Sequence, residues 1–208
     1  MFRVAGSEGF GKEVGLVEEM IKTGRRVGAS RSFYAALAHD NDLFQRMVAL
    51  VALEKGVTIT TIGAECSFGV MISIASNQRN YSYDGALGRL HPGLIGPDHF
   101  EITEFGFVGT ETRLYCNDAL RALVDEGLSI CKLRDIPALV ASCPRLPDFK
   151  PIIVLSDELP IEGSVVVISR DHRGRGNMSI EKPISDRHWA HHPMFVGRRE
   201  SKVKPLHS

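Results

Sequence analysis

The sequence KPIIVLSDELPIEGSVVVIS, residues 150–169, decides the class of fold. It contains two apolar runs, PIIVLS at 151–156 and GSVVVIS at 163–169, which are joined by a turn segment at 157–163. Both runs are rich in β-branched residues and therefore predict strands. Because neither run alternates strictly between apolar and polar residues, we expect both faces of these strands to be covered by other parts of the chain.

Other strands are indicated on both sides of this pair. VTITTI at 57–62 is β-branched and has a glycine at each end. Weaker patterns predict strands at 110–116, 129–132 and 177–181, and a turn at Gly174 and Gly176 precedes the last of these. MFVG at 194–197 is expected to close the sheet as an edge strand.

Helices are predicted mainly in the first quarter of the chain, where apolar residues recur at helical spacing. Ser30 is the expected N-cap of one helix, and Asp40 or Asn41 that of the next, which ends before Gly56. The predicted helices cover residues 11–28, 30–38, 41–55, 67–75, 117–127 and 133–143. For 67–75 a strand is the alternative, because its residues suit a strand by propensity while Ser67 could cap a helix.

This order of elements indicates an α+β fold, with an N-terminal helical segment packed on a small mixed or antiparallel sheet. We expect a flexible tail at 1–10 and one α+β domain at 11–199. That domain has a helical part at 11–56 and a mixed part at 57–199, and a basic tail follows at 200–208. Residues 77–99 are rich in glycine and proline and are predicted to form one long loop.

Composition argues against a polyanionic partner. The chain has 208 residues, with 25 Lys and Arg against 25 Asp and Glu, so its formal net charge is zero. Global charge therefore gives no attraction to nucleic acid or to an anionic membrane. The N-terminal residues lack the apolar run of a signal peptide, and no apolar run is long enough to span a bilayer. With four scattered cysteines and no CxxC pair, these features predict a cytoplasmic protein.

Basic residues gather in two places that could bind phosphate or nucleic acid. Arg170, Arg173 and Arg175 flank the glycines of GRGN, and backbone amides beside guanidinium groups can hold an anion. The alternative is a hairpin turn with charged flanks. The second group is Arg198, Arg199, Lys202 and Lys204 near the C-terminus, for which the alternative is a solvated tail.

A metal site is possible in SDRHWAHHP, which contains Asp186, His188, His191 and His192. On a helix His188 and His192 would share one face, as zinc ligands at i and i+4 do. Pro193 would shorten any such helix, and no glutamate stands between the histidines to act as a base. Exposed histidines without metal are the alternative.

Other chemistry has weaker signals. Asp98 and His99 in GPDHFEI could bind a ligand or catalyse a reaction, or Asp98 could cap a turn that Phe100 anchors in the core. Neither a G-x-x-x-x-G-K-[ST] loop nor a G-x-G-x-x-G loop after a strand is present, so no cofactor is expected. The motif G-x-S-x-G is absent too, and the cysteines lie in or beside apolar segments, which indicates burial.

Four segments together resemble a diffuse family of small bacterial proteins, found chiefly in environmental bacteria with reduced gene sets, to which no activity is assigned. They are VGASRSFYAALAHDNDLFQRMVALVA, GPDHFEI, DALRALVDEGLSICKLRDIPALVASCPRL and KPIIVLSD, over about residues 25–170. The shared pattern consists of Phe33, a valine-rich helix end at 48–53, Ile95 with the pair His99 and Phe100, and an apolar strand at 152–155.

The chain departs from that family in two places. Gly85 follows Tyr83 and Asp84 where the family often has a tryptophan, and HWAHHP replaces a tryptophan–aspartate segment. The resemblance implies a bacterial, cytoplasmic, single-domain protein and assigns no catalytic residue.

Three functions follow as hypotheses. The first is a non-enzymatic module that binds another protein, because the surface is predicted to be neutral and no catalytic motif is found. The second is an accessory protein of nucleic acids that uses the two basic groups. The third is a metal-dependent enzyme that uses the C-terminal histidines. The sequence leaves the oligomeric state open.

Overall fold

The computed structural model describes residues 21–23, 25–63, 65–109, 116–182, 192–199 and 202–205. The chain divides into two compact units, Met1–Phe44 and Gln45–Ser208, which we describe separately. The tail expected at 1–10 and most of the helix expected at 11–28 lie outside the described residues.

The described part of the first unit is helical. Helix α2 (Arg31–His39) begins after Ser30, whose Oγ accepts the N–H of Phe33 at 3.2 Å, as the predicted cap requires. Helix α3 (Asn41–Lys55) begins after Asp40, whose Oδ1 accepts the N–H groups of Asp42 and Leu43. The sequence predicted either Asp40 or Asn41 as the N-cap of this helix, and the structure shows that it is Asp40. The last three turns of α3 belong to the second unit.

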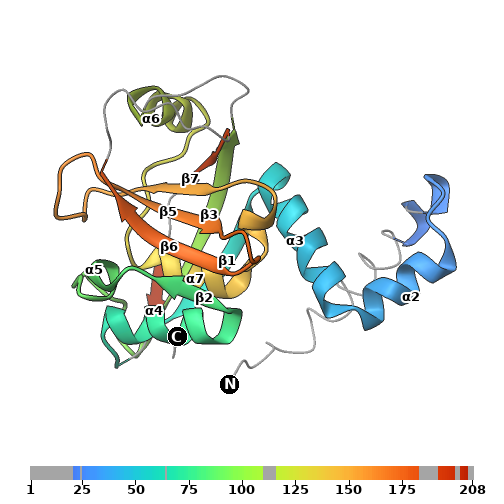
Figure 1. Ribbon diagram of the computed structural model, residues 1–208, viewed down its shortest axis with the longest axis horizontal. Helices are drawn as coiled ribbons and strands as arrows, with labels where there is room; N and C mark the ends of the chain where they lie inside the picture. The colour runs from blue at the N-terminus through green and yellow to red at the C-terminus, as the bar shows by residue number, and fades with distance from the viewer. Residues whose placement is uncertain are drawn as a thin grey trace. The chain divides into compact units, whose positions relative to one another are not determined.

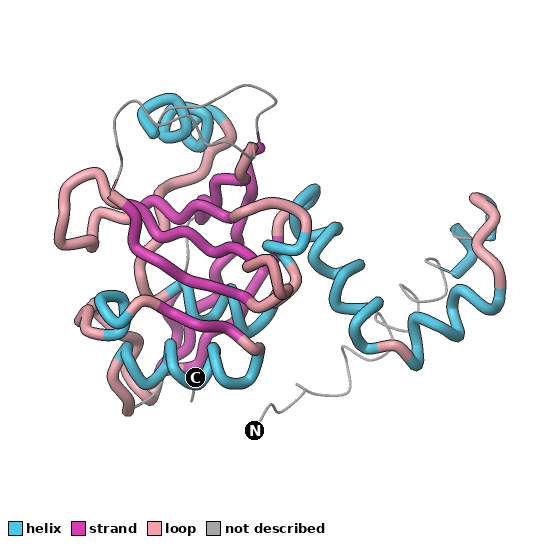
Figure 2. Tube along the Cα trace, viewed as in Figure 1, coloured by secondary structure: helices cyan, strands magenta, loops and turns pink. Residues whose placement is uncertain are grey.

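The second unit is built on one mixed, eight-stranded sheet, which confirms the predicted α+β class (Figures 1 and 2). The order is β1-β3-β7-β4-β5-β6-β2, and β8 also pairs with β3. The β4–β7 and β2–β6 pairs are parallel, and the other pairs are antiparallel. The strands are β1 (Val57–Ile62), β2 (Tyr81–Tyr83), β3 (His99–Gly109), β4 (Ile152–Leu155), β5 (Val165–Arg170), β6 (Gly176–Glu181), β7 (Met194–Arg198) and β8 (Lys202–Pro205).

Helices cover both faces of the central strands. One face packs against α4 (Phe68–Arg79), α5 (Gly85–Gly88), α7 (Asp135–Ser142) and the short 3-10 helix η1 (Leu146–Asp148). The other face packs against α6 (Cys116–Asp125). Figure 1 shows α6 and α4 on opposite sides of the strands.

The core shows why residues 150–169 are apolar without alternation. Ile152 and Val154 of β4 belong to the cluster under α4 and α7, whereas Ile153 and Leu155 belong to the cluster under α6. All four are buried, and a fully buried side chain of this size contributes about 1.5–3 kcal/mol. The prediction of cover on both faces is confirmed.

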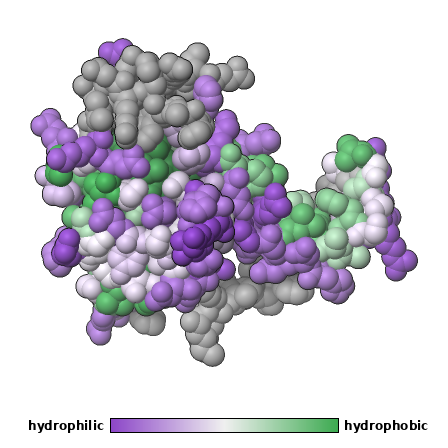
Figure 3. Space-filling model, viewed as in Figure 1, coloured by the Kyte–Doolittle hydropathy of each residue, from purple (hydrophilic) through white to green (hydrophobic). Residues whose placement is uncertain are grey.

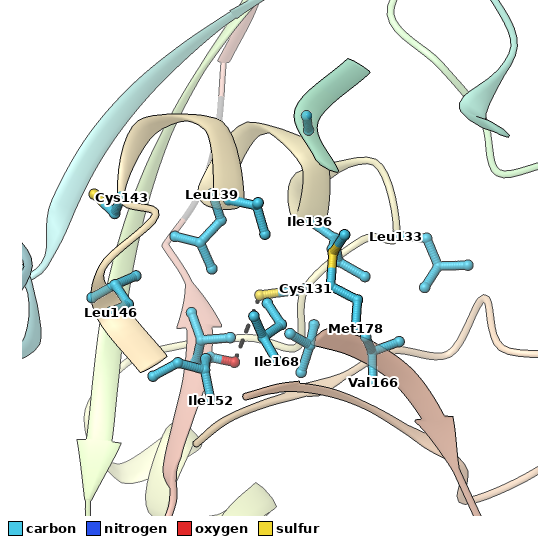
Figure 4. Close-up of a cluster of buried hydrophobic side chains, with 14 of the residues drawn as sticks. Cys131, Leu133, Ile136, Leu139, Cys143, Leu146, Ile152, Val166, Ile168 and Met178 are labelled. Carbon is cyan, nitrogen blue, oxygen red and sulfur yellow. Dashed lines mark hydrogen bonds between the residues drawn. The ribbon is translucent and has the colours of Figure 1, made fainter. Parts of the chain in front are cut away.

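Cys131 lies inside the larger cluster, between side chains of α7 and of the sheet (Figure 4). Its thiol donates to the carbonyl oxygen of Val196 at 3.6 Å. Burial raises the pKa of Cys131 well above its ordinary value, and Asp135 raises it further. The thiol is therefore protonated and acts as a small apolar side chain.

Two predictions about strands are wrong. MFVG at 194–197 is not at an edge, because β7 lies between β3 and β4 in the middle of the sheet. Residues 129–132 do not form a strand, since only Ser129 makes an isolated bridge, to Arg198. The longest strand of the sheet, β3, was not predicted.

The loop predicted at 77–99 is shorter than expected. α4 continues to Arg79, and β2 and α5 follow within this range. The strand expected at 110–116 falls mostly outside the described residues, and Cys116 at its end begins α6. None of the helices in the described ranges combines the length and the apolar character that a bilayer span requires.

Candidate functional site

The most concentrated group of buried charges joins β3, β7 and α7. Arg198 of β7 donates from Nη2 to Oε1 of Glu101 at 2.8 Å and from Nη1 to Oδ2 of Asp135 at 3.0 Å. Arg134 holds the same Glu101 from its Nε and Nη2 atoms at 3.0 and 3.1 Å. Glu101, Asp135 and Arg198 are 1%, 5% and 6% exposed, so this network is nearly withdrawn from water.

The two carboxylates and two guanidinium groups of this network balance in charge. Burial raises the pKa of Asp135, whereas Arg198 and the N–H of Lys132, at 2.8 Å from Oδ2, lower it. Arg134 also donates from Nη1 to the carbonyl oxygen of Gly93 at 3.1 Å. These contacts bind α7 and the loop at Gly93 to the sheet, so we assign the network a structural role.

The three arginines near GRGN lie around the hairpin that connects β5 and β6. Arg170 is committed to protein groups: its Nε lies 2.6 Å from Oδ1 of Asp148, and its Nη2 donates to the carbonyl oxygen of Pro144 at 2.9 Å. Arg173 is exposed, and the Nε of Arg175 donates to Oδ2 of Asp171 at 3.0 Å. The segment GRGN thus forms a hairpin turn with charged flanks, which was the alternative to an anion-binding loop.

The second basic group does not form one surface. Arg198 is buried in the network described above, where it pairs with Glu101 and Asp135. It is therefore not part of an exposed basic surface. Arg199 is exposed and lies 3.4 Å from Glu104. Lys202 and Lys204 lie on β8, and Lys204 is exposed, while the side chain of Lys202 is not described.

The two basic groups lie on strands that are not neighbours in the sheet. β8 pairs with β3 on the same side as β7, because β1 occupies the other side of β3. Two steps of roughly 4.8 Å, or about 10 Å, separate β5, which carries Arg170, from β7, which carries Arg198.

The histidine cluster falls largely outside the described residues, which exclude Asp186, His188 and His191. His192 is exposed and has a φ of 45°. Among the residues that the structure describes, no three His, Cys, Asp or Glu side chains gather as metal ligands would. The metal site stays a prediction.

Asp98 and His99 are both exposed, at the turn where β3 begins. The N–H of His99 donates to the carbonyl oxygen of Gly96 at 3.0 Å, and its own carbonyl oxygen accepts the N–H of Gly63 at 2.9 Å. Phe100 is half-buried behind them. These contacts are those of a turn that leads into a strand.

The feature that the sequence analysis missed is the outer edge of β1. Within the described ranges β1 pairs with β3 alone and ends the strand order. The hydrogen bond from Gly63 to His99 sets the alternation, so the N–H and C=O groups of Val57, Ile59 and Thr61 point to β3. Those of Thr58, Thr60 and Ile62 point away from it.

The side chains of β1 follow the same alternation. Ile59 is buried in the core, while Thr58 and Thr60 are exposed and Ile62 is 54% exposed. An added strand would therefore find backbone donors and acceptors and would lie beside small β-branched side chains. The signal in the sequence was the absence of charge and proline from VTITTI.

The other two ends of the sheet differ from β1. β8 carries Lys204 and Pro205, which are residues that hinder the pairing of edge strands. β2 has three residues, and α5 begins two residues after it. β1, with six uncharged residues, is the longest and least protected of the three edges.

A hollow beside β3 is small. It has a volume of about 110 Å³ and lies between the end of α3, β3 and Arg199. Pockets that enclose small ligands usually measure roughly 300–1,000 Å³. In the space-filling view of this unit, hydrophilic residues dominate the middle of the face that is drawn (Figure 3).

Comparison with known proteins does not add a family. No protein-family model, curated protein or solved structure matches the chain. The resemblance to small bacterial proteins therefore stays a prediction.

Proposed function

We propose that the protein is a non-enzymatic interaction module of a bacterial cytoplasm, and that it binds a partner protein by accepting an extended strand along β1. In this mode of recognition, main-chain hydrogen bonds supply affinity and the alternate side chains supply specificity. The observation that carries the proposal is the outward direction of the backbone groups of Thr58, Thr60 and Ile62, on an edge that none of the described strands covers.

The nucleic-acid hypothesis has less support. Arg170 and Arg198 are occupied by carboxylates and carbonyl groups of the protein itself. Binding that weakens steeply with rising salt concentration would favour it over the interaction module.

A peptide selection tests strand addition. An extended-peptide library would be selected on the immobilised protein, and the affinity of the peptides obtained would be measured by fluorescence anisotropy. Thr60→Pro removes one outward N–H group, and proline is tolerated on edge strands where the N–H faces solvent. Thr60→Val keeps the N–H and the branched shape, so it is the matched control.

We expect Thr60→Pro to weaken peptide binding at least tenfold and Thr60→Val to change it little. Thermal unfolding of both variants shows whether the fold is retained. Peptides that bind both variants equally, or a protein that selects no peptide and pairs with no strand at β1, would overturn the proposal.

A further inference from the structure

We infer that the strand which β1 accepts is β1 of a second copy of this chain, paired in antiparallel orientation about a two-fold axis at Thr60. This inference rests on the proposed function and names the partner for the same edge. The reasons are the self-complementarity of the edge, its lack of charge and the zero net charge of the chain.

The edge is complementary to itself. With the axis at Thr60, each Thr60 lies opposite the Thr60 of the second copy, and each Thr58 lies opposite an Ile62. All three residues direct one N–H and one C=O outward, so the donors of one copy meet the acceptors of the other. About six hydrogen bonds between the copies follow from the alternation of an antiparallel ladder.

The side chains suit this register as well. Thr58, Thr60 and Ile62 project to the same face of the sheet and are exposed. Cross-strand pairs of threonine with threonine and of β-branched residues with one another are favourable in antiparallel sheets. The symmetric pairing would therefore cover Ile62, which is 54% exposed in the single chain.

Charge favours a second copy over a charged partner segment. The strand has neither acidic nor basic residues, so it offers no ion pair to a charged peptide. The chain carries 25 basic and 25 acidic residues, so two copies have no net repulsion to overcome. Two-fold dimers with the same patch on both subunits are the commonest oligomers, and a continuous sheet across the axis is one of their simplest forms.

Charge reversal at the axis is the sharpest test. In Thr60→Lys two like charges would face each other across the axis, and the same holds for Thr60→Glu, whereas a mixture of the two variants places Lys opposite Glu. Ser82→Lys adds the same charge on β2 at the other edge and is the control. Native mass spectrometry and light scattering after gel filtration would measure the mass of each sample.

We expect a dimer for the natural chain and for Ser82→Lys. Each Thr60 variant alone should dimerise at least tenfold more weakly, and the mixture should recover a dimer that contains one copy of each. Far-ultraviolet circular dichroism shows whether the variants are folded. A natural chain that stays monomeric while peptides bind in a Thr60-dependent way would overturn this inference and leave the proposed function standing. A dimer unaffected by either Thr60 variant would overturn the β1 pairing.

Discussion

The guanidinium group of Arg198 lies 2.8 Å from the carboxylate of Glu101, although the two residues are 97 positions apart in the chain. The contact joins neighbouring strands β7 and β3, and the same guanidinium group reaches Asp135 at the start of α7. The strands and the helix are thereby fixed by charges that water scarcely reaches. Removing Arg198 leaves Asp135 buried without this guanidinium group, while Glu101 keeps only Arg134 as a cationic partner among the contacts described above.

Arg198→Met should lower the free energy of unfolding by about 3–5 kcal/mol, because it leaves two buried carboxylates without this cation. Urea denaturation followed by circular dichroism would measure the change. Arg199→Met is the matched control at the next position, since Arg199 is exposed and pairs with the exposed Glu104. Its loss should cost less than about 1 kcal/mol. If both variants lose the same free energy of unfolding, the buried network stabilises the fold no more than the exposed ion pair does.

The ionisation of Asp135 should make stability depend on pH in one direction. Burial raises the pKa of Asp135 above the ordinary value of 3.8, so the folded state binds this proton more tightly than the unfolded state. The corresponding stabilisation is complete below pH 3.8 and is lost as the pH rises through the raised pKa. The free energy of unfolding of the natural chain, minus that of Asp135→Asn, should therefore fall with rising pH across this interval. A difference that rises over the same interval would contradict the direction of the shift.

The strands β4 and β5 were predictable because burial on both faces leaves continuous apolar runs. β3 was not predictable, because at its start the polar residues, rather than the apolar ones, point into the core. Glu101 and Thr103 point inward and are buried, whereas Ile102 between them is only half-buried. A buried glutamate is tolerated there because Arg134 and Arg198 neutralise it, and these partners come from distant parts of the sequence.

The place of each strand in the sheet was not predictable for a related reason. The four residues MFVG have the same local pattern at an edge as in the centre, and only pairing with both β3 and β4 makes β7 central. The composition of VTITTI was visible in the sequence, but its exposed edge depends on which segments do not pair with it. The candidate site therefore required the topology.

Thiol reactivity should distinguish the described cysteines. Burial raises the pKa of Cys143 to about 11, so roughly one molecule in a thousand carries the thiolate at pH 8. Cys131 is buried too, whereas Cys66 is partly exposed. Iodoacetamide at pH 8 should alkylate Cys66 first in the folded protein, as peptide mass spectrometry would show. In urea the three cysteines should react at similar rates, and rapid alkylation of Cys143 in the folded state would mean that this part of the core opens readily.

Gly197 and Gly106 are neighbours across β7 and β3, and together they leave room for Leu128 on the sheet. A Cβ at Gly197 would lie 2.8 Å from Cβ of Leu128 and 3.0 Å from the carbonyl oxygen of Ser129. Because the sheet is central and packed on both faces, the neighbours have little room to move, and Gly197→Ala should destabilise the fold by about 1–3 kcal/mol.

Gly85→Ala is the control for this substitution, since a Cβ there meets nothing within 4 Å and alanine favours the helix. It should leave stability unchanged or raise it by up to about 1 kcal/mol. Gly106→Ala tests the contact with Leu128, because its Cβ would lie 2.8 and 2.9 Å from Cδ1 and Cδ2 of Leu128, which Leu128→Ala removes. In a Leu128→Ala background the cost of Gly106→Ala should therefore be smaller than in the natural chain. Thermal and urea unfolding of the four members of this cycle would measure the difference. If the two costs simply add, the space at Gly106 is not reserved for the side chain of Leu128.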